Sequence, residues 1–156
     1  MATSQMLAQD VFSYLRPEQI DAIHSASQVV ERRAGEVVYN QGDEAKFLYV
    51  VLEGKVALRL PGKKGLSILI ELLDRGTMFG AGAGFALQAY TVNAQCLADS
   101  KLLKIDASLL QHLMEDDCRM GYALQKRISE LYFKRYIKTM LKFQDVVMSI
   151  PLEASP

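Results

Sequence analysis

The sequence predicts a mainly β fold with flanking helices, in which an antiparallel sandwich or barrel is followed by a long C-terminal helix. Between Val29 and Leu73 the apolar residues recur with a period close to two, which is typical of half-buried strands. Turn signals rich in glycine interrupt this pattern at intervals of about ten residues. From Arg119 to Met148 the apolar residues instead recur every three or four positions, which predicts a helix.

Short β segments occupy the middle of the chain. The predicted strands are 29–32, 36–39, 47–52, 55–60, 66–72, 91–97 and 101–105. The turns between them, such as Ala34-Gly35, Glu53-Gly54 and Pro61-Gly62, are too short for the crossover that parallel strands require. Neighbouring strands are therefore expected to run antiparallel.

Helical patterns flank these strands. The predicted helices are 5–15, where the pattern is weak, 17–27, 108–115 and 119–148. Pro17 suits the first turn of its helix, because proline has a fixed φ and lacks the N–H that this turn leaves unpaired. The acidic run Glu115-Asp116-Asp117 is most simply a solvated junction between helices; the alternative is that it places favourable negative charge at the start of the long helix.

Length and composition limit the classes of function. The chain has 156 residues, of which 50% are hydrophobic, and this is enough for one domain with a full core. Its 18 basic and 18 acidic residues balance, so no nucleic-acid partner is expected. No apolar run reaches the roughly 20 residues of a membrane helix, and the N-terminus lacks a signal-peptide pattern. These features predict a cytoplasmic protein with no membrane partner.

The glycine-rich stretch from Gly76 to Ala94 is the strongest candidate for a binding site. Glycines at 76, 80, 82 and 84 let the backbone adopt positive φ and let a ligand approach main-chain N–H groups. The alternative is that each glycine only serves a tight turn. The stretch matches neither the ATP-binding P-loop pattern nor the dinucleotide pattern of a βαβ unit.

Several segments resemble one family. They are 31–43 (ERRAGEVVYNQGD), 48–56 (LYVVLEGKV), 76–80 (GTMFG) and 89–92 (AYTV). They look like the cyclic nucleotide-binding domain of catabolite-activator-type bacterial regulators, and the similarity covers nearly the whole chain. The resemblance implies an antiparallel β jelly-roll (double-stranded β-helix), a phosphate-binding cassette with a short helix, and a C-terminal helix that closes the pocket and often forms a dimer.

The resemblance also implies a set of ligand-binding residues. They are Phe79, Gly80, Ala81, Gly82, Ala83, Gly84, Gln88, Ala89 and Tyr90, with Arg135 and Tyr136 contributing from the long helix. In cyclic nucleotide binders of this family a glutamate for the ribose occupies the place of Ala81, and an arginine for the phosphate occupies the place of Gln88. A neutral amide cannot replace the charge-assisted contact of arginine. A changed or lost ligand is therefore expected, no cofactor is assigned, and a cyclic nucleotide is disfavoured.

The long helix has a wide apolar stripe, which suggests a second surface to bury beyond its own domain. A homodimer is expected, with Ile137, Met140 and Phe143 near its interface; the alternative is that the whole stripe packs within one chain. The predicted organisation is a domain over 1–118 with the jelly-roll, the long helix over 119–148 and a tail over 149–156. So few residues follow the long helix that no helix-turn-helix module is expected.

Catalysis has weak support in the sequence. His24 and His112 are predicted on different helices, so they do not form the ligand cluster of a metal-dependent jelly-roll enzyme. Cys96 alternates with apolar residues on a predicted strand, which favours a buried, inert thiol. Tyr122, Tyr132 and Tyr136 on the long helix are expected to be core or interface residues.

Three hypotheses for a non-enzymatic function follow. The first is a stand-alone regulatory module that senses a small ligand through a degenerate cassette. The second is an assembly protein that binds no ligand and acts through its long helix. The third is a cyclic nucleotide binder that uses non-standard contacts.

Overall fold

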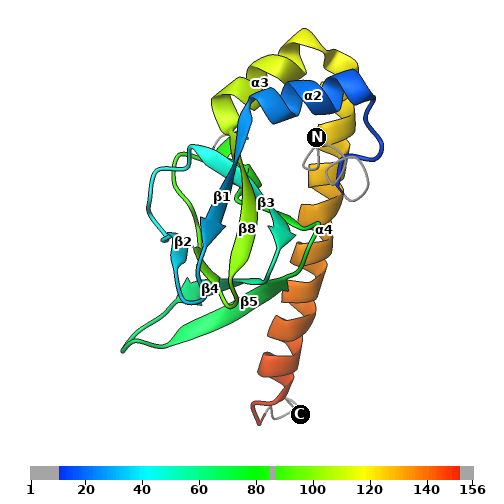
Figure 1. Cartoon of the computed structure of the whole chain (residues 1–156). Helices are drawn as coiled ribbons and strands as arrows, with labels where there is room; N and C mark the ends of the chain where they lie inside the picture. The colour runs from blue at the N-terminus through cyan, green and yellow to red at the C-terminus, as the bar shows by residue number, and fades with distance from the viewer. Residues whose placement is uncertain (1–10, 85–86, 152–156) are drawn as a thin grey trace, which may run out of the picture. The chain divides into compact units, whose positions relative to one another are not determined.

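The computed structural model describes residues 11–84 and 87–151 of the chain. It divides into two compact units, Met1–Ala123 and Leu124–Pro156. Unit 1 holds the described strands and the shorter helices, whereas unit 2 is formed mainly by the long helix (Figure 1). No helix among the described residues combines the length and the apolar character that crossing a membrane requires. The predicted boundary at residue 118 stays a prediction.

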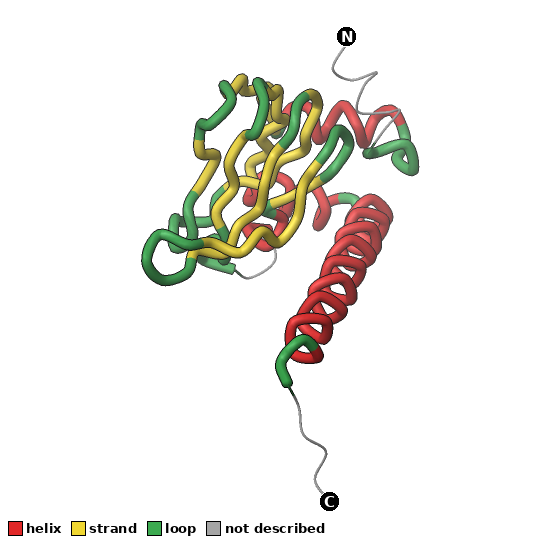
Figure 2. The backbone as a smooth tube through the Cα atoms, turned by 90° about the horizontal axis from the view of Figure 1, so that it is seen from below, coloured by secondary structure: helices red, strands yellow, loops and turns green. Residues whose placement is uncertain are grey.

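Two four-stranded antiparallel sheets form the centre of unit 1. The first sheet has the order β1-β8-β3-β6, with β1 Ser27–Arg32, β8 Ser100–Asp106, β3 Phe47–Glu53 and β6 Met78–Phe79. The second has the order β2-β7-β4-β5, with β2 Val37–Tyr39, β7 Asn93–Cys96, β4 Val56–Pro61 and β5 Ser67–Leu73. In Figure 2 these strands, in yellow, lie together in one β structure. The predicted antiparallel jelly-roll with flanking helices is confirmed.

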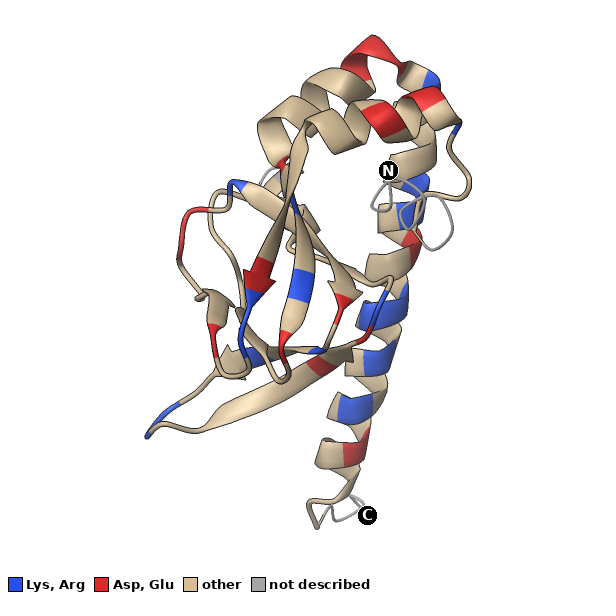
Figure 3. Cartoon of the chain, in the orientation of Figure 1, with Lys and Arg blue, Asp and Glu red and all other residues tan. Residues whose placement is uncertain are grey.

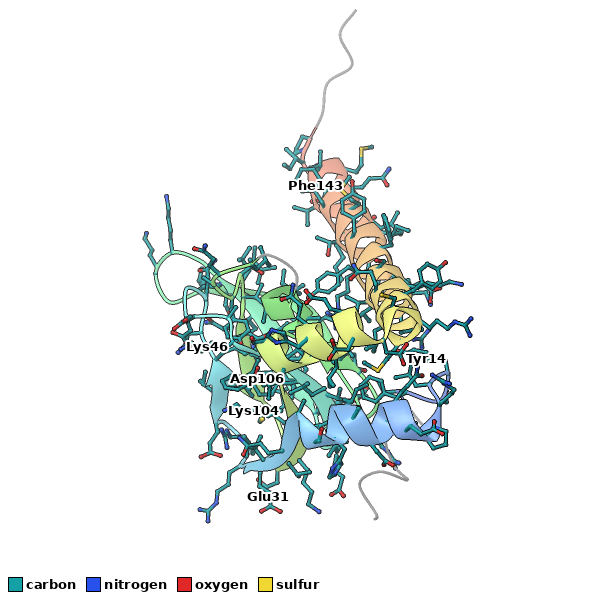
Figure 4. The ribbon with its side chains drawn as sticks, turned by 90° about the horizontal axis from the view of Figure 1, so that it is seen from above. Tyr14, Glu31, Lys46, Lys104, Asp106 and Phe143 are labelled. Atoms are coloured by element: carbon teal, nitrogen blue, oxygen red, sulfur yellow. The ribbon has the colours of Figure 1, made fainter. Side chains whose placement is uncertain are left out.

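Helices lie before, within and after the run of strands, and a capping residue joins the last strand to the helix that follows it. They are α2 Pro17–Ser25, the short 3₁₀ helix η1 Ala81–Gly84, α3 Ala107–Asp116 and α4 Cys118–Met148. Asp106, labelled in Figure 4, ends β8, and its carboxylate accepts a hydrogen bond from the Leu109 N–H at 2.9 Å. This capping bond satisfies an N–H group in the first turn of α3, so the helix begins directly after the strand.

The hydrophobic core lies between the two sheets, because both contribute to it. Its buried members are Tyr39, Tyr49, Val51, Val56, Leu58, Leu73, Phe79, Tyr90, Ala94, Cys96 and Leu102. Outside the sheets, α2 contacts β1 and α3, and its Ile20 and Ile23 are buried together with Phe12 and Leu15 of the preceding segment. The β structure is therefore packed on its interior and also covered by helices at one end.

A polar junction joins α2 to the start of α4. Asp117 accepts a hydrogen bond from the Gln19 side chain at 2.7 Å and one from the Met120 N–H at 3.0 Å. These two bonds, with a smaller contribution from the Arg16 guanidinium, lower the pKa of Asp117. The negative charge that the alternative interpretation of the acidic run placed at the start of the long helix is thus present, and the last carboxylate of the run caps that helix.

One observed element was not predicted, and two predicted elements differ from the observed ones. β6 was not predicted, because two residues next to glycines show no periodicity. β7 begins at Asn93, two residues later than expected, because Thr91 and Val92 belong to the preceding turn. The weak helix 5–15 lies partly outside the described residues, and residues 11–15 form turns instead.

Gly54 occupies the tightest backbone position of the β structure. Its φ of +94° is strained for any residue with a side chain, and a Cβ atom would overlap the Ser100 hydroxyl and lie 2.6 Å from the Asp99 carbonyl oxygen. Gly35 has a similar φ of +88° but has no heavy atom within 4 Å of the same Cβ position. A substitution at Gly35 would therefore introduce backbone strain alone, whereas a substitution at Gly54 would introduce both strain and steric overlap.

We expect Gly54→Ala to lower the free energy of unfolding by roughly 2–5 kcal/mol, because strain and overlap add. Gly35→Ala, the matched control, should cost only about 1–2 kcal/mol, from strain alone. Urea denaturation followed by circular dichroism measures both values. Equal losses in the two variants would contradict the packing described at the β3–β4 turn.

Candidate functional site

The predicted cassette forms a strand, a bend and a short helix. β6 pairs with β3 through Phe79 and Tyr49, and the chain then turns at Gly80 into η1. The Ala83 N–H donates to the Gly80 carbonyl oxygen at 3.2 Å and closes the first turn of η1. η1 contacts β3 and α3, so the cassette lies at the end of the β structure that the helices cover.

Gly80 is needed at the bend for two reasons. Its φ is +70°, a conformation that favours glycine. A Cβ atom at this position would also lie 3.3 Å from the Phe47 carbonyl oxygen and 3.4 Å from the rings of Tyr39 and Tyr90. The cassette backbone therefore lies close to two aromatic side chains, Tyr39 on β2 and Tyr90 in the segment between η1 and β7.

Four aromatic rings, which we call the aromatic cluster, occupy the interior next to the cassette. They are Tyr39, Tyr49, Phe79 and Tyr90, all of them buried. The Tyr39 and Tyr90 rings stack with centroids 3.7 Å apart and planes 9° apart, and the Tyr49 and Phe79 rings stack at 5.3 Å. Sequence reasoning placed Phe79 and Tyr90 in the site but missed the cluster, because its members are far apart along the chain.

The Tyr90 hydroxyl anchors the cluster to the backbone of β3. It donates a hydrogen bond to the Phe47 carbonyl oxygen at 2.6 Å and accepts one from the Phe47 N–H at 3.2 Å. Burial is the main cause that raises the pKa of Tyr90, and burial together with the neighbouring Tyr90 raises the pKa of Tyr49. Both phenols are therefore neutral at physiological pH and act as hydrogen-bonding groups rather than as bases.

Backbone hydrogen bonds hold the segment after η1 against the loop that precedes β3. The Ala45 N–H donates to the Gln88 carbonyl oxygen at 2.9 Å, and the Tyr90 N–H donates to the Asp43 carbonyl oxygen at 3.0 Å. The Gly42 N–H completes the pairing with the Tyr90 carbonyl oxygen at 2.9 Å. This arrangement fixes the main chain of Gln88 and leaves its side chain exposed.

The structure divides the predicted ligand-binding residues into groups by burial. Phe79, Ala81 and Tyr90 are buried, and Ala81 has no exposed surface at all. Gly80, Gly82, Ala83 and Ala89 are half-buried, Gln88 is exposed, and Gly84 ends η1. None of these residues carries a charge. Arg135 and Tyr136 belong to unit 2, and their contribution to the site stays a prediction.

The groups that could support catalysis are separate from one another. His24 lies on α2 and His112 on α3, as predicted. Cys96 is buried, as predicted, and burial raises the pKa of its thiol although a hydrogen bond with Ser100 opposes the shift. Among residues 11–84 and 87–151, no group of three or more His, Cys, Asp or Glu side chains could hold a metal ion.

We expect Tyr90→Phe to lower the free energy of unfolding by about 1–3 kcal/mol, because the Phe47 N–H and carbonyl groups lose a buried partner while the ring stack remains. Tyr122→Phe is the matched control, since the Tyr122 side chain is exposed and should give no measurable change. Thermal and urea denaturation give the two values. If Tyr90→Phe left the free energy of unfolding unchanged, the hydroxyl would not anchor the cluster.

Comparison with known proteins identifies the fold and the family. A 26% identical match over 116 residues joins the chain to a lysophospholipase nte1 from Aspergillus terreus, covering 74% of this chain and 8% of that protein. A CRP-like cAMP-activated global transcriptional regulator from Mycobacterium tuberculosis is 24% identical over a match that covers 68% of this chain and 47% of that protein. The chain thus spans less than half the length of either relative.

Among solved structures, the sensor domain of the transcriptional regulator DNR from Pseudomonas aeruginosa superimposes with a TM-score of 0.74 at 22% identity. The superposition covers 86% of this chain and 91% of that domain, and it supports the jelly-roll with its C-terminal helix. The family described as the cyclic nucleotide-binding domain matches residues 29–117, which include both sheets apart from the first residues of β1. On this match, the chain belongs to the cyclic nucleotide-binding domain family.

Proposed function

We propose that the chain is a cytoplasmic regulatory module that senses a small, weakly charged or mostly apolar molecule in place of a cyclic nucleotide. The observation that carries this proposal is the arrangement of Ala81 and Gln88. The first is fully buried and apolar, and the second is neutral and exposed. The chain keeps the fold of the family. At the two positions where a glutamate for ribose and an arginine for phosphate are expected, it has a methyl group and a neutral amide.

A cyclic phosphate would be poorly compensated at this cassette. The described cassette residues offer neutral groups only, and neutral hydrogen bonds recover only part of the free energy lost when a charge leaves water. Ala81 has no exposed surface, so a glutamate there would lie buried against the packed interior. Both considerations disfavour a cyclic nucleotide that binds through non-standard contacts.

The accessible part of the cassette suits a smaller ligand. Gly80, Gly82, Ala83 and Ala89 are half-buried and present backbone and methyl surface, while Gln88 adds a neutral donor and acceptor. A polar end of the ligand would meet backbone N–H groups of the Gly80–Gly84 bend, and its apolar body would lie on small side chains. This proposed contact set excludes the buried atoms of Ala81.

A second candidate function is assembly without a small ligand, and the aromatic cluster favours it. Tyr39 and Tyr90 stack in contact beside the cassette, so the protein's own side chains fill this part of the interior. A module of this kind would act through protein contacts. Both candidates share the proposal of a homodimer through α4.

The exposed face of α4 supports the proposed homodimer. Phe133, Tyr136, Met140 and Phe143 are exposed and follow one another by three, four and three residues, which is the spacing of a coiled-coil stripe. Ile137, between them, is also exposed. Exposed contiguous apolar surface of this kind marks an interaction site, and a second copy of the helix would bury it symmetrically.

We predict that titration calorimetry will detect no binding of cyclic AMP or cyclic GMP at micromolar Kd. A ligand screen by thermal shift on the full chain tests sensing itself, because a molecule present at 100 times its Kd adds about 2.7 kcal/mol of stability. A weakly charged hit that Gly82→Val abolishes supports the sensor function. A micromolar Kd for either nucleotide would overturn the proposed ligand change, and a screen without hits would leave assembly as the function.

We predict that Ile137→Asp converts the dimer to a monomer, because an unpaired buried charge costs several kcal/mol. Lys138→Asp is the control: Lys138 is also exposed, and it lies two residues, or about 200° around the helix, from both Tyr136 and Met140, so it faces away from the stripe. Multi-angle light scattering gives the mass of each variant. A monomeric unmodified chain, or equal dissociation by both substitutions, would contradict the proposed interface.

A further inference from the structure

The hairpin formed by β4 and β5 projects beyond the other strands of unit 1 (Figure 1). A tight turn closes its tip, where the Gly62 N–H donates to the Leu66 carbonyl oxygen at 2.8 Å and the Leu66 N–H donates to the Lys63 carbonyl oxygen at 3.2 Å. Lys64 adopts a φ of +57° within this turn. The tip is therefore a hydrogen-bonded structure with a defined conformation.

Aliphatic side chains on this hairpin are exposed to solvent. Leu66 is 73% exposed, Ile68 is 62% exposed and Leu69 is 43% exposed. Leu66 lies in the tip turn, and Ile68 and Leu69 lie at the start of β5, so the three side chains are close together in sequence at the tip end of the hairpin. Large apolar side chains gathered on a projecting element are unusual for a surface without a partner.

The same hairpin is positively charged. Residues 56–73 contain three basic residues, Arg59, Lys63 and Lys64, and one acidic residue, Glu71, so both lysines of the tip lie in a segment with a net charge of +2. Figure 3 shows the basic colour at the tip. Within the part of the chain that the structure describes, neither Lys63 nor Lys64 forms an ion pair. Their charge is therefore available to a partner.

We propose, in place of the absence of a membrane partner expected from the sequence, that the β4–β5 hairpin docks the protein on the surface of a lipid bilayer that contains anionic lipid. A convex tip with aliphatic side chains beside unpaired lysines matches the interfacial region, where apolar groups enter the acyl boundary and ammonium groups meet anionic headgroups. Nucleic acid would use the lysines but would leave the aliphatic side chains in water. The bilayer accounts for both features and needs no preformed pocket.

Charge disfavours a second copy of this chain as the occupant. Two hairpins meeting at their tips would bring four unpaired lysines together. The remaining large exposed apolar surface, on α4, lies in the segment Leu124–Pro151, which has six basic and two acidic residues and a net charge of +4. Like charges would oppose the hairpin there as well. The docking surface is thus independent of the proposed homodimer.

Co-sedimentation with vesicles tests the proposal on the full chain. Vesicles of phosphatidylcholine mixed with phosphatidylserine should bind the protein, whereas vesicles of phosphatidylcholine alone should bind it weakly. Binding should fall when salt is raised to about 1 M, where the screening length is only about 3 Å. No binding to the anionic vesicles would overturn the proposal.

Paired variants assign the binding to the hairpin. Lys63→Gln with Lys64→Gln should weaken binding about 25-fold, which is about fivefold for each lysine. Arg119→Glu changes the net charge by the same amount at an exposed residue on α4 and should have a smaller effect. Leu66→Ser with Ile68→Ser should also weaken binding, whereas Leu97→Ser with Leu109→Ser, at exposed positions elsewhere in unit 1, should not.

Two outcomes of the variants would count against the bilayer. Equal losses in the hairpin and control variants would mean that binding depends only on net charge. A hairpin variant that changes the mass in light scattering would identify the hairpin as a contact between protein chains. The same vesicle measurement on Ile137→Asp separates this proposal from the homodimer, because docking should persist in the monomer.

Discussion

The Tyr90 side chain is the contact on which the architecture of the cassette depends. Its hydroxyl binds both backbone groups of Phe47, which begins a strand of the first sheet. Its ring stacks on Tyr39, which ends a strand of the second sheet. Tyr90, which follows the cassette, thus connects the two sheets, and glycine at position 80 lets the cassette backbone approach this connection closely at a positive φ.

This constraint separates the residues that maintain the fold from those that would choose a ligand. Gly80 forms the bend and the aromatic cluster fills the interior, and both roles are independent of what the module binds. The Gln88 side chain has no comparable role, because it is exposed, whereas Ala81 contributes a buried methyl group to the interior and lies outside the proposed contact set. A jelly-roll of this family can therefore keep its geometry while its recognition chemistry changes.

The sequence predicted the elements with strong periodicity and missed features that depend on distant residues. The strands from β1 to β5 and the long helix were predicted to within a few residues, because alternation and three-to-four spacing extend over each of them. β6 has only two residues and could not show a period. Tyr90 was predicted as a ligand-binding residue, which stays a prediction; its stacking partner Tyr39 lies on a strand that the sequence could not position against it. Tyr122, Tyr132 and Tyr136 were expected in a core or interface; all three are exposed, and only a partner could still bury them.

The two cysteines differ in a way that has a practical use. Cys96 is enclosed in the core with a raised pKa, so its thiol is both inaccessible and protonated, whereas Cys118 is exposed at the start of α4. A thiol-directed fluorophore or spin label would therefore react at a single position of the unmodified protein. The natural chain carries its own labelling site at the base of the long helix, and changes there can be followed without introducing or removing a cysteine.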